Sequence, residues 1–505
     1  MKKLLISLSA ALCSVILFSF IIDQPIWVSK FLQVNKDGSI TYFPDEKGNV
    51  IPDFSLVGYY HGLKKIPSVK IIRTVNPIKG DAGAMIQAAI DEVSALPVGT
   101  DGFRGAILLS KGEYQIAGTL NITASGIVLK GEGNTEKGTK LVATGNQQRS
   151  LLKINGKGKV TETGSRIKIT DQYVPCGAKS FNLASTKDLK TGDKIMVYRP
   201  GTDQWIHDLQ MDQIVAREGT KQWKGADYNL SYERKITAIE GHKITIDNPI
   251  VMAMEDQYGG GQVFKYEFKG RLNEVGVENI YFESAYAGDT DEQHGWVAVD
   301  FNNIENAWVD AVTSRYFGYS CVSLGGGAKN ITVQNSRCFD AKSVITGGRR
   351  YSFNNDGQQN FFTNLETTEG RHDYVTGAKT CGPNVFYNCK ARNTHADIGP
   401  HHRWATGTLY DNIDTDGEIN IQDRGNWGSG HGWSGVNQVL WNCKVSGAAV
   451  QNPWVSGKNY AIGVQGKKLK GRLDGKPDGI WEGENKNGVE PVSLYEAQVK
   501  ARLLK

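Results

Sequence analysis

The sequence predicts an all-β fold: a right-handed, single-stranded parallel β-helix with an N-terminal capping helix and a β-rich insertion. Two observations lead to this prediction. Glycine contributes 59 of the 505 residues without forming a glycine-rich linker, which indicates frequent tight turns between short strands. Short apolar strands also recur at a period in the mid-twenties, which is typical of stacked coils that cannot bury their apolar faces alone.

The chain divides into five expected segments, because composition and periodicity change along it. In order along the chain, the segments contain an apolar leader, a helix followed by the first strands, a region of alternating apolar and polar residues, the strand repeat, and a tail in which the repeat is no longer present. These segments are a signal peptide (1–22), an N-terminal region with the capping helix and first coils (23–161), a β-rich insertion (162–270), the main β-helix coils (271–465) and a C-terminal tail with a short helix (466–505).

The first residues are typical of a secretory signal. Lys2 and Lys3 precede an apolar run over residues 4–22, and this order of charge and apolar residues predicts export. We therefore expect a secreted or periplasmic protein, with a retained membrane anchor or an outer-membrane lipoprotein at Cys13 as alternatives. No later stretch is apolar enough to span a bilayer, so we expect no stable membrane span after signal removal.

Charge and cysteine usage narrow the function classes. A net charge of +5 is small for this length and does not favour nucleic-acid binding, and we expect a monomer. The six cysteines after the leader form no CxxC pair, so we expect buried thiols, with a disulfide between neighbouring coils as the alternative. These cysteines are Cys176, Cys321, Cys338, Cys381, Cys389 and Cys443.

The segment 81–96 (DAGAMIQAAIDEVSAL) predicts the capping helix. Its apolar residues recur at helical spacing, and short strands with glycine turns follow it. A helix in this place would cover the open end of a β solenoid. In the insertion, alternating apolar and polar residues predict antiparallel strands. There Trp205, Trp223 and Tyr228 are expected to fill a small core, with the wall of a cleft as the alternative.

Seven short strands define the repeat between residues 277 and 445. The residue before each apolar run serves as an anchor, and consecutive anchors lie 24 to 30 residues apart. Asparagine at such a turn tolerates a left-handed φ and can bond to the asparagines of adjacent coils. The anchors are Asn279, Asn306, Asn330, Asn360, Asn384, Thr408 and Gln438.

With GDAGAMIQAAID, the opening strands and the asparagine-anchored coils, residues 75–460 resemble the pectin-lyase-like, or pectate lyase, superfamily. The resemblance implies a parallel β-helix. It leaves the reaction open, since this superfamily includes lyases, hydrolases, epimerases and tail-spike proteins. Its members often use calcium, so Ca²⁺ is a possible cofactor here.

Histidine and arginine gather in the connections between the repeat strands. Five of the nine histidines fall between residues 372 and 431, beside Arg and Asp, in EGRHDYVTGAK, THADIGPHHRWATG and QDRGNWGSGHGW. Counting from the anchors aligns Arg349, Lys379 and Arg403 in one column. Asp373 and Asp397 then share another, with successive members about 4.8 Å apart. Like charges at that spacing repel each other, and binding of an acidic partner to the cation column would relieve the repulsion. A ladder of Asp–Arg pairs is the alternative.

The preferred hypothesis is a secreted polysaccharide lyase that cleaves a uronic-acid-containing glycan by β-elimination. This reaction needs a neutralised uronate carboxylate, a base for the C5 proton and an acid for the leaving oxygen. The arginines and Lys379 suit the carboxylate, a histidine or Lys379 suits the base, and aspartates would hold any calcium. The candidate catalytic residues are Arg349, His372, Asp373, Lys379, His395, Asp397, His402, Arg403 and Asp423.

Two other functions remain open. A glycoside hydrolase would use two of Asp373, Asp397 and Asp423 on successive coils, and a non-catalytic solenoid would only bind carbohydrate. We expect Trp404 and Trp433 to be exposed for sugar stacking. A histidine-bound metal is disfavoured because adjacent His401 and His402 would point to opposite faces of a strand. Candidate substrate-binding residues are Arg350, Arg371, His401, Trp404, Arg424, His431 and Trp433.

Overall fold

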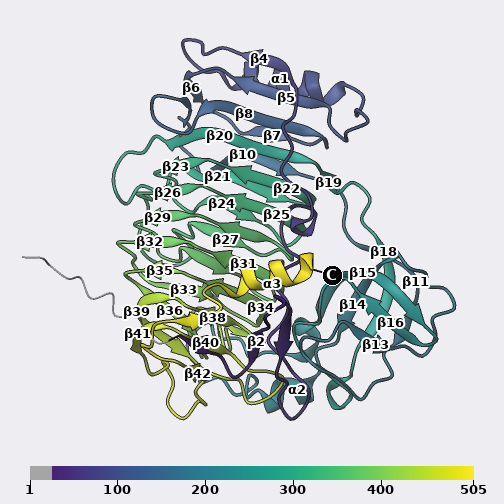
Figure 1. Ribbon diagram of the computed structural model, residues 1–505. Coiled ribbons are helices and arrows are strands. Elements are labelled where there is room, and N and C mark those ends of the chain that lie inside the picture. Colours follow the sequence, from purple (N-terminus) through teal and green to yellow (C-terminus); the bar gives the residue numbers. More distant parts are fainter. Residues whose placement is uncertain (1–25, 505) are drawn as a thin grey trace, which may run out of the picture.

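The chain folds as a single-stranded parallel β-helix with three faces, which confirms the predicted fold class (Figure 1). The computed structural model describes residues 26–504, so the predicted signal peptide (1–22) and Cys13 lie outside the described residues. Strands of successive coils pair in parallel along each face. No helix in the described residues is long and apolar enough to cross a membrane.

The first face carries the longest run of strands. In order, they are β4 (Ile71–Val75), β5 (Gly105–Leu109), β8 (Ile127–Gly133), β20 (Val275–Ser284), β22 (Ile304–Asp310), β25 (Ala328–Gln334), β28 (Phe361–Thr363), β31 (Cys381–Tyr387), β34 (Ala405–Asp411), β38 (Val439–Trp441), β40 (Tyr460–Ile462) and β42 (Ile480–Glu482). The short strands β19 (Leu272–Asn273) and β37 (Gly435–Val436) pair at its edge.

The second and third faces complete each coil. The second contains β6 (Gly112–Ile116), β9 (Thr139–Ala143), the end of β20, β23 (Thr313–Arg315), β26 (Arg337–Phe339), β29 (Glu366–Thr368), β32 (Lys390–Arg392), β35 (Asp414–Thr415), β39 (Lys444–Val450) and β41 (Gln465–Lys468). The third contains β7 (Leu120–Ile122), β10 (Arg149–Asn155), β21 (Gly295–Asn302), β24 (Ser320–Leu324), β27 (Phe353–Asn355), β30 (Tyr374–Thr376), β33 (Asp397–Pro400) and β36 (Glu418–Ile421).

Asparagines hold the coils in register, although not all at the predicted positions. Three anchors (279, 306 and 330) have positive φ angles of 55°, 51° and 54°. The more regular ladder lies at the turn between the first and second faces, where asparagines at 335, 364, 388, 412 and 442 share φ angles of 51–55°. Within it, Asn388 donates to Asn364 at 2.7 Å and Asn442 donates to Asn412 at 2.9 Å. The Asn364 amide likewise donates to Asn335 at 3.2 Å, whereas the Asn412 amide donates to Asp411 and to the Val492 carbonyl.

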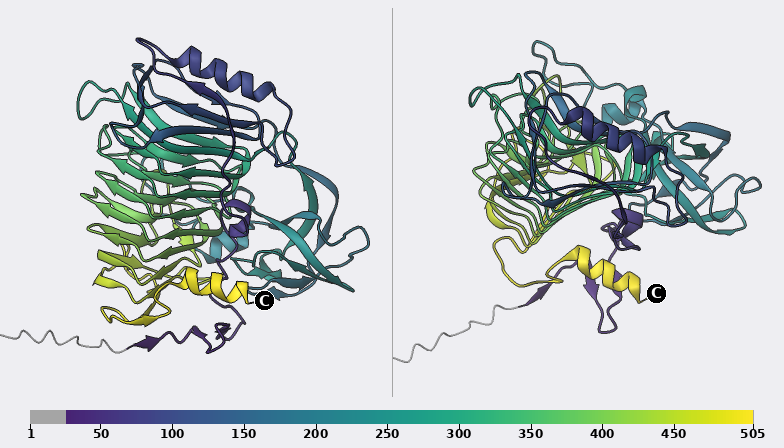
Figure 2. Two further views of the ribbon diagram at one scale, coloured as in Figure 1. Left: turned by 45° about the horizontal axis from the view of Figure 1, so that its top comes forward. Right: turned by 90° about the horizontal axis from the view of Figure 1, so that it is seen from above.

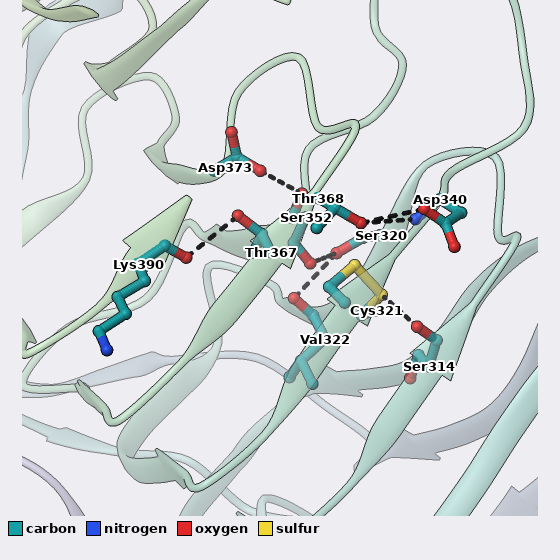
Figure 3. Close-up of a disulfide and its surroundings, with 11 residues drawn as sticks. Ser314, Ser320, Cys321, Val322, Asp340, Ser352, Thr367, Thr368, Asp373 and Lys390 are labelled. Atoms are coloured by element: carbon teal, nitrogen blue, oxygen red, sulfur yellow. Dashed lines mark hydrogen bonds between the residues drawn. A yellow bond between two sulfur atoms is a disulfide. The ribbon is translucent and has the colours of Figure 1, made fainter. Parts of the chain in front are cut away.

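A disulfide crosses the interior between two faces. Cys321 in β24 and Cys338 in β26 are both buried and bonded to each other, 17 residues apart in sequence (Figure 3). The expectation of buried thiols is therefore wrong for these two, while the alternative, a disulfide, is realised. The other described cysteines are free and buried: Cys176, Cys381, Cys389 and Cys443.

Helices cover one end and one side of the solenoid (Figure 2). Helix α1 (Gly83–Ala95) lies across the N-terminal coils and buries Ile86, Ala89, Ile90 and Val93, as the periodicity predicts. Helix α3 (Leu494–Leu503) packs on the outside of the first face, where Tyr495 stacks on Phe361 at a ring-centroid distance of 4.5 Å.

The N-terminal segment 26–75 follows the outside of the first face from one end to the other. It contains β1 (Trp27–Val28), β2 (Leu32–Val34), β3 (Ile40–Tyr42) and the 3-10 helix η1 (Tyr59–Gly62). β1 pairs with β43 (Val489–Glu490) near the C-terminus, whereas β4 pairs with β5 near the first coil. This segment therefore links the two ends of the solenoid.

The insertion forms a separate antiparallel sheet beside the lower coils (Figure 1). Its core contains Trp205, Trp223 and Tyr228, which are all buried as the core prediction requires, although Trp223 and Tyr228 also line a small cavity, as in the alternative. The sheet order is β11 (Thr161–Lys168), β18 (Gln262–Glu267), β14 (Lys194–Arg199), β15 (Leu230–Glu240), β16 (Lys243–Ile246) and β13 (Ser180–Asn182), with β12 (Tyr173–Val174), β17 (Met254–Glu255), α2 (Asp203–Asp208), η2 (Gly225–Tyr228) and η3 (Asp256–Tyr258) around it.

A buried ion-pair network connects the insertion to the coils. Glu233 of β15 is 3% exposed and accepts from Arg271 at 2.7 Å and from Tyr266 at 2.6 Å. Lys329 of β25 lies 3.4 Å from the same carboxylate. Although desolvation opposes ionisation, Lys329 and Arg271 lower the pKa of Glu233 to about 2.

We expect Glu233→Gln to lower the free energy of unfolding by about 3 kcal/mol at neutral pH, because two buried cations lose their partner. Since the pKa of Glu233 is depressed when folded, the ionised group stabilises the fold above its unfolded value of about 4.3. That contribution is lost as the pH falls through about 2. Urea unfolding at several pH values measures both effects. Glu267→Gln, which removes an exposed pair with Lys269, is the matched control and should change little.

Candidate functional site

A cavity of about 750 Å³ opens on the third face, over β27, β30 and β33. Its walls come from the strands and from the connections that precede and follow them. The polar and aromatic residues that line it are Tyr319, Thr346, Tyr351, Asn354, Asp356, Arg371, His372, Asp397, His401, His402, Arg424, Trp427, Ser429 and His431.

Four histidines meet in this cavity. The ring of His401 lies 4.4 Å from His372, 5.1 Å from His402 and 5.1 Å from His431 between centroids. The prediction that His401 and His402 point to opposite faces is therefore wrong. The reason is local: β33 ends at Pro400, so the alternation of a strand no longer applies to the two residues after it.

Burial keeps these imidazoles neutral. Desolvation, with help from neighbouring arginines and imidazoles, lowers the pKa of His372 and His402 to about 4 and of His431 to about 3, and it lowers the pKa of His401 further. His372 Nδ1 donates to the backbone oxygen of Asp397 at 2.7 Å, which leaves Nε2 with a free lone pair. Each of the four rings has a buried nitrogen without a partner in the described structure.

One buried ion pair lies next to the four histidines. Arg424 of the connection after β36 binds the carboxylate of Asp397, and the two side chains are 2% and 9% exposed. His372 Nδ1 is also 3.4 Å from Asp397 Oδ1. Arg424 outweighs desolvation and lowers the pKa of Asp397. The Asp397 carboxylate is thus ionised and already paired with Arg424.

The predicted column of three cations exists only in part. Lys379 and Arg403 lie on adjacent coils, since the Lys379 amide donates to the Arg403 carbonyl at 2.9 Å. Arg349 is not in the column and instead binds Glu292 at 2.6 and 2.8 Å. The extra residues of its coil fall between β26 and β27, before Arg349, so the gapless alignment from Asn330 is wrong.

The carboxylate column is also divided. Asp373 lies in register with Ser352 of the preceding coil, whose hydroxyl donates to the Asp373 carboxylate at 2.9 Å (Figure 3). It is buried outside the cavity, and desolvation raises its pKa to about 6. Asp423 is buried with Lys476 at 2.9 Å. Neither of these aspartates lines the cavity, unlike Asp397.

Four other predicted residues also lie away from the cavity. His395 binds Glu369 at 2.7 Å, and Arg350 is buried against backbone oxygens and Ser343. The expected exposure of Trp404 and Trp433 is wrong, since both are fully buried. They pack against the insertion: Trp404 contacts Trp205, and Trp433 donates to the Leu209 carbonyl. The strand periodicity could not predict this burial, because the residues that cover the surface belong to the insertion.

Several lining residues were not among the predicted site residues. Tyr351 stands 4.9 Å from His372 and 5.3 Å from His401 between ring centroids, and desolvation raises its pKa. Asp356 faces the cavity with a pKa that desolvation also raises. Trp427 is 39% exposed beside them. Tyr351 and Asp356 belong to the string RRYSFNND, directly after the predicted site residues Arg349 and Arg350. This proximity in the sequence could have identified them as site residues.

The described residues show no site for the Ca²⁺ ion that the family resemblance implies as a cofactor. In residues 26–504, no group of three or more His, Cys, Asp or Glu side chains is arranged to hold a metal ion. Asp373, Asp397 and Asp423 make separate contacts, as described above. We therefore derive no step through calcium.

No protein-family model and no curated protein matches the sequence. Among solved structures, alginate lyase from Paenibacillus sp. str. FPU-7 aligns at 9% identity over 83% of this chain and 99% of its own, with a TM-score of 0.38. DFA-IIIase from Arthrobacter chlorophenolicus A6 aligns at 9% identity over 79% and 88%, also with a TM-score of 0.38. ORF18 of Geobacillus virus E2 aligns at 12% identity over 81% of this chain but 59% of its own, with a TM-score of 0.36. Similarities at such low identities and TM-scores do not indicate which reaction this chain catalyses.

The four cavity histidines should titrate well below the ordinary histidine value of about 6.5. Since their folded pKa values are depressed, their contribution to stability is present above about 6.5 and is lost as the pH falls through about 4. NMR titration of the imidazole Cε1–H signals measures this. His207, whose pKa Asp212 raises, is the internal control. A cluster histidine that titrates at or above 6.5 would contradict the assignment.

Proposed function

We propose that this chain is a polysaccharide lyase that cleaves a uronic-acid-containing glycan by β-elimination in the histidine cavity. The observation that carries the proposal is the composition of that cavity. Within residues 26–504, neutral histidines with unpartnered nitrogens stand beside Arg371, which no carboxylate binds, whereas the ionised carboxylate of Asp397 is already bound to Arg424. Bases and a carboxylate receptor are what elimination requires.

Arg371 suits the uronate carboxylate. It lines the cavity and donates to the Gly347 carbonyl, an uncharged acceptor, so its positive charge remains available. A guanidinium binds a carboxylate bidentately and withdraws charge from it, which acidifies the neighbouring C5–H. Arg424 cannot do the same, because Asp397 occupies it.

His402 and His431 are the candidates for the base, since both are less buried than His372 and His401. An imidazole with a pKa near 4 is free base at neutral pH but a weak one. The arriving uronate places a negative charge beside it, which raises the pKa of the imidazole toward neutrality. The substrate thus strengthens the base that acts on it.

The elimination balances with residues of the cavity. The base takes the C5 proton, the C5–H electron pair forms the C4=C5 double bond, and the C4–O bond breaks. The leaving oxygen then needs one proton. Tyr351 suits this step, because its raised pKa keeps the hydroxyl protonated beside the histidines. The tyrosine and the imidazolium return to their starting forms by proton exchange with solvent.

Glycoside hydrolysis is the second candidate, favoured by one observation. Asp356 and Asp397 line the same cavity, and their pKa values are shifted in opposite directions, as an acid and a base would be. Against it, both oxygens of Asp397 face Arg424 or His372 and are not free for water or sugar. We therefore rank hydrolysis second.

We place this activity outside the cytoplasm, in the secreted or periplasmic space. The predicted leader at 1–22 supports this location, and so does the Cys321–Cys338 disulfide, which persists in oxidising compartments.

We expect the protein to generate an unsaturated, ultraviolet-absorbing product from at least one polyuronate, such as polygalacturonate, alginate or hyaluronan. His402→Gln and Arg371→Gln should each lower kcat/KM by about 100-fold or more, because they remove the base and the carboxylate receptor. His207→Gln, on the exposed surface of the insertion, is the matched control and should leave the rate unchanged. Reducing ends without absorbance would establish hydrolysis instead, and no product from any glycan would support a binding solenoid.

A further inference from the structure

Two smaller cavities adjoin the histidine cavity where the insertion meets the coils. One, of about 420 Å³, shares Ser429 with it, and the other, of about 510 Å³, shares Asp356. The two smaller cavities share Ala378 and Lys379 with each other. The three cavities therefore lie next to one another around residues 377–379.

The 420 Å³ cavity is rich in positive charge. Lys221, Lys379 and Arg403 line it, against one acidic residue, Asp227. Lys379 and Arg403 lie on adjacent coils, about one strand spacing apart in the backbone. Like charges on neighbouring strands repel each other, and an anion between them would relieve that repulsion.

Both cations are held by uncharged acceptors. Lys379 Nζ donates to the Asp227 backbone oxygen at 2.7 Å, and Arg403 donates to the Ser429 hydroxyl at 2.5 Å. These bonds orient the side chains without neutralising them. By contrast, Arg349, the third member of the predicted column, is neutralised by Glu292. The charge that faces the 420 Å³ cavity therefore remains available to a ligand.

The insertion supplies the opposite wall. Trp223 and Tyr228 stack at 4.1 Å between ring centroids, and Lys379 Nζ lies 5.9 Å from the Tyr228 ring. The Lys221 amide donates to the Ser429 carbonyl, and Arg217 donates to the Gly428 carbonyl at 3.0 Å. These contacts fix the loop 425–432, which also carries His431 and Trp427 into the main cavity.

We propose that Lys379 and Arg403 form a second carboxylate subsite, which holds an acidic sugar next to the one in the histidine cavity. This inference rests on the proposed function, because it assigns the neighbouring residue of the same glycan. It also predicts a substrate class: a polymer with acidic sugars close together along the chain, bound through at least two of them. A glycan with one isolated uronate would use only half of the site.

The test is binding, measured apart from turnover. All variants are made in a His402→Gln background, so that the probe survives, and are run by affinity electrophoresis in gels that contain alginate, a carboxyl-free sulfated galactan or neutral dextran. We expect Lys379→Gln plus Arg403→Gln to weaken the retention constant for alginate at least tenfold. The charge-conserving Lys379→Arg should retain binding, and the exposed Lys269→Gln is the control for loss of charge.

Three results would overturn the subsite. The double variant could bind alginate as tightly as its parent, the parent could bind no acidic polymer, or the double variant could lose affinity only for the sulfated galactan. The third result would assign the subsite to sulfate esters and not to carboxylates. A loss of alginate binding without any absorbing product from the wild-type protein would instead uphold the subsite while refuting the elimination reaction.

Discussion

The stacking of coils is the constraint on which the rest of the structure depends. No coil buries its apolar residues alone, so each must lie on the next in parallel register, about 4.8 Å away. Side-chain bonds between Asn335 and Asn364, Asn364 and Asn388, and Asn412 and Asn442 help to fix that register, and the Asn388 backbone amide donates to the Asp411 carbonyl of the next coil. Register in turn decides which residues, some 24 positions apart in sequence, become neighbours in space.

The site arises where stacked coils meet the insertion. The coils supply His372, Asp397 and His401 at the edge of the third face, but a bare solenoid face is open to water. The insertion, through α2 and the connection that follows it, buries Trp404 and Trp433 and helps to hold the loop that carries His431. Desolvation near this junction lowers the histidine pKa values. The buried Glu233 network connects the sheet to the coils at a fixed position.

The sequence was enough to predict the coils, the capping helix and the gathering of histidines, because each leaves a periodic or compositional signal. Positions in connections were less predictable. Lys379 and Arg403 aligned correctly since no length change separates them, whereas the longer β26–β27 connection displaced Arg349. The burial of Trp404 depends on an insertion some two hundred residues earlier in the chain, and no local pattern records that contact.

The charges of the candidate site favour the proposed acidic polymer over a neutral one. In residues 26–504, Arg371, Lys379 and Arg403 donate to uncharged acceptors, and no carboxylate neutralises them. The cavity histidines stay neutral chiefly because they are desolvated, and the nearby arginines add to the cost of protonating them. A carboxylate entering the cavity reverses both effects: it offsets the cations and makes an imidazolium easier to form. A neutral sugar would provide neither, so under the proposed mechanism the imidazole becomes a stronger base only when an anion occupies the site.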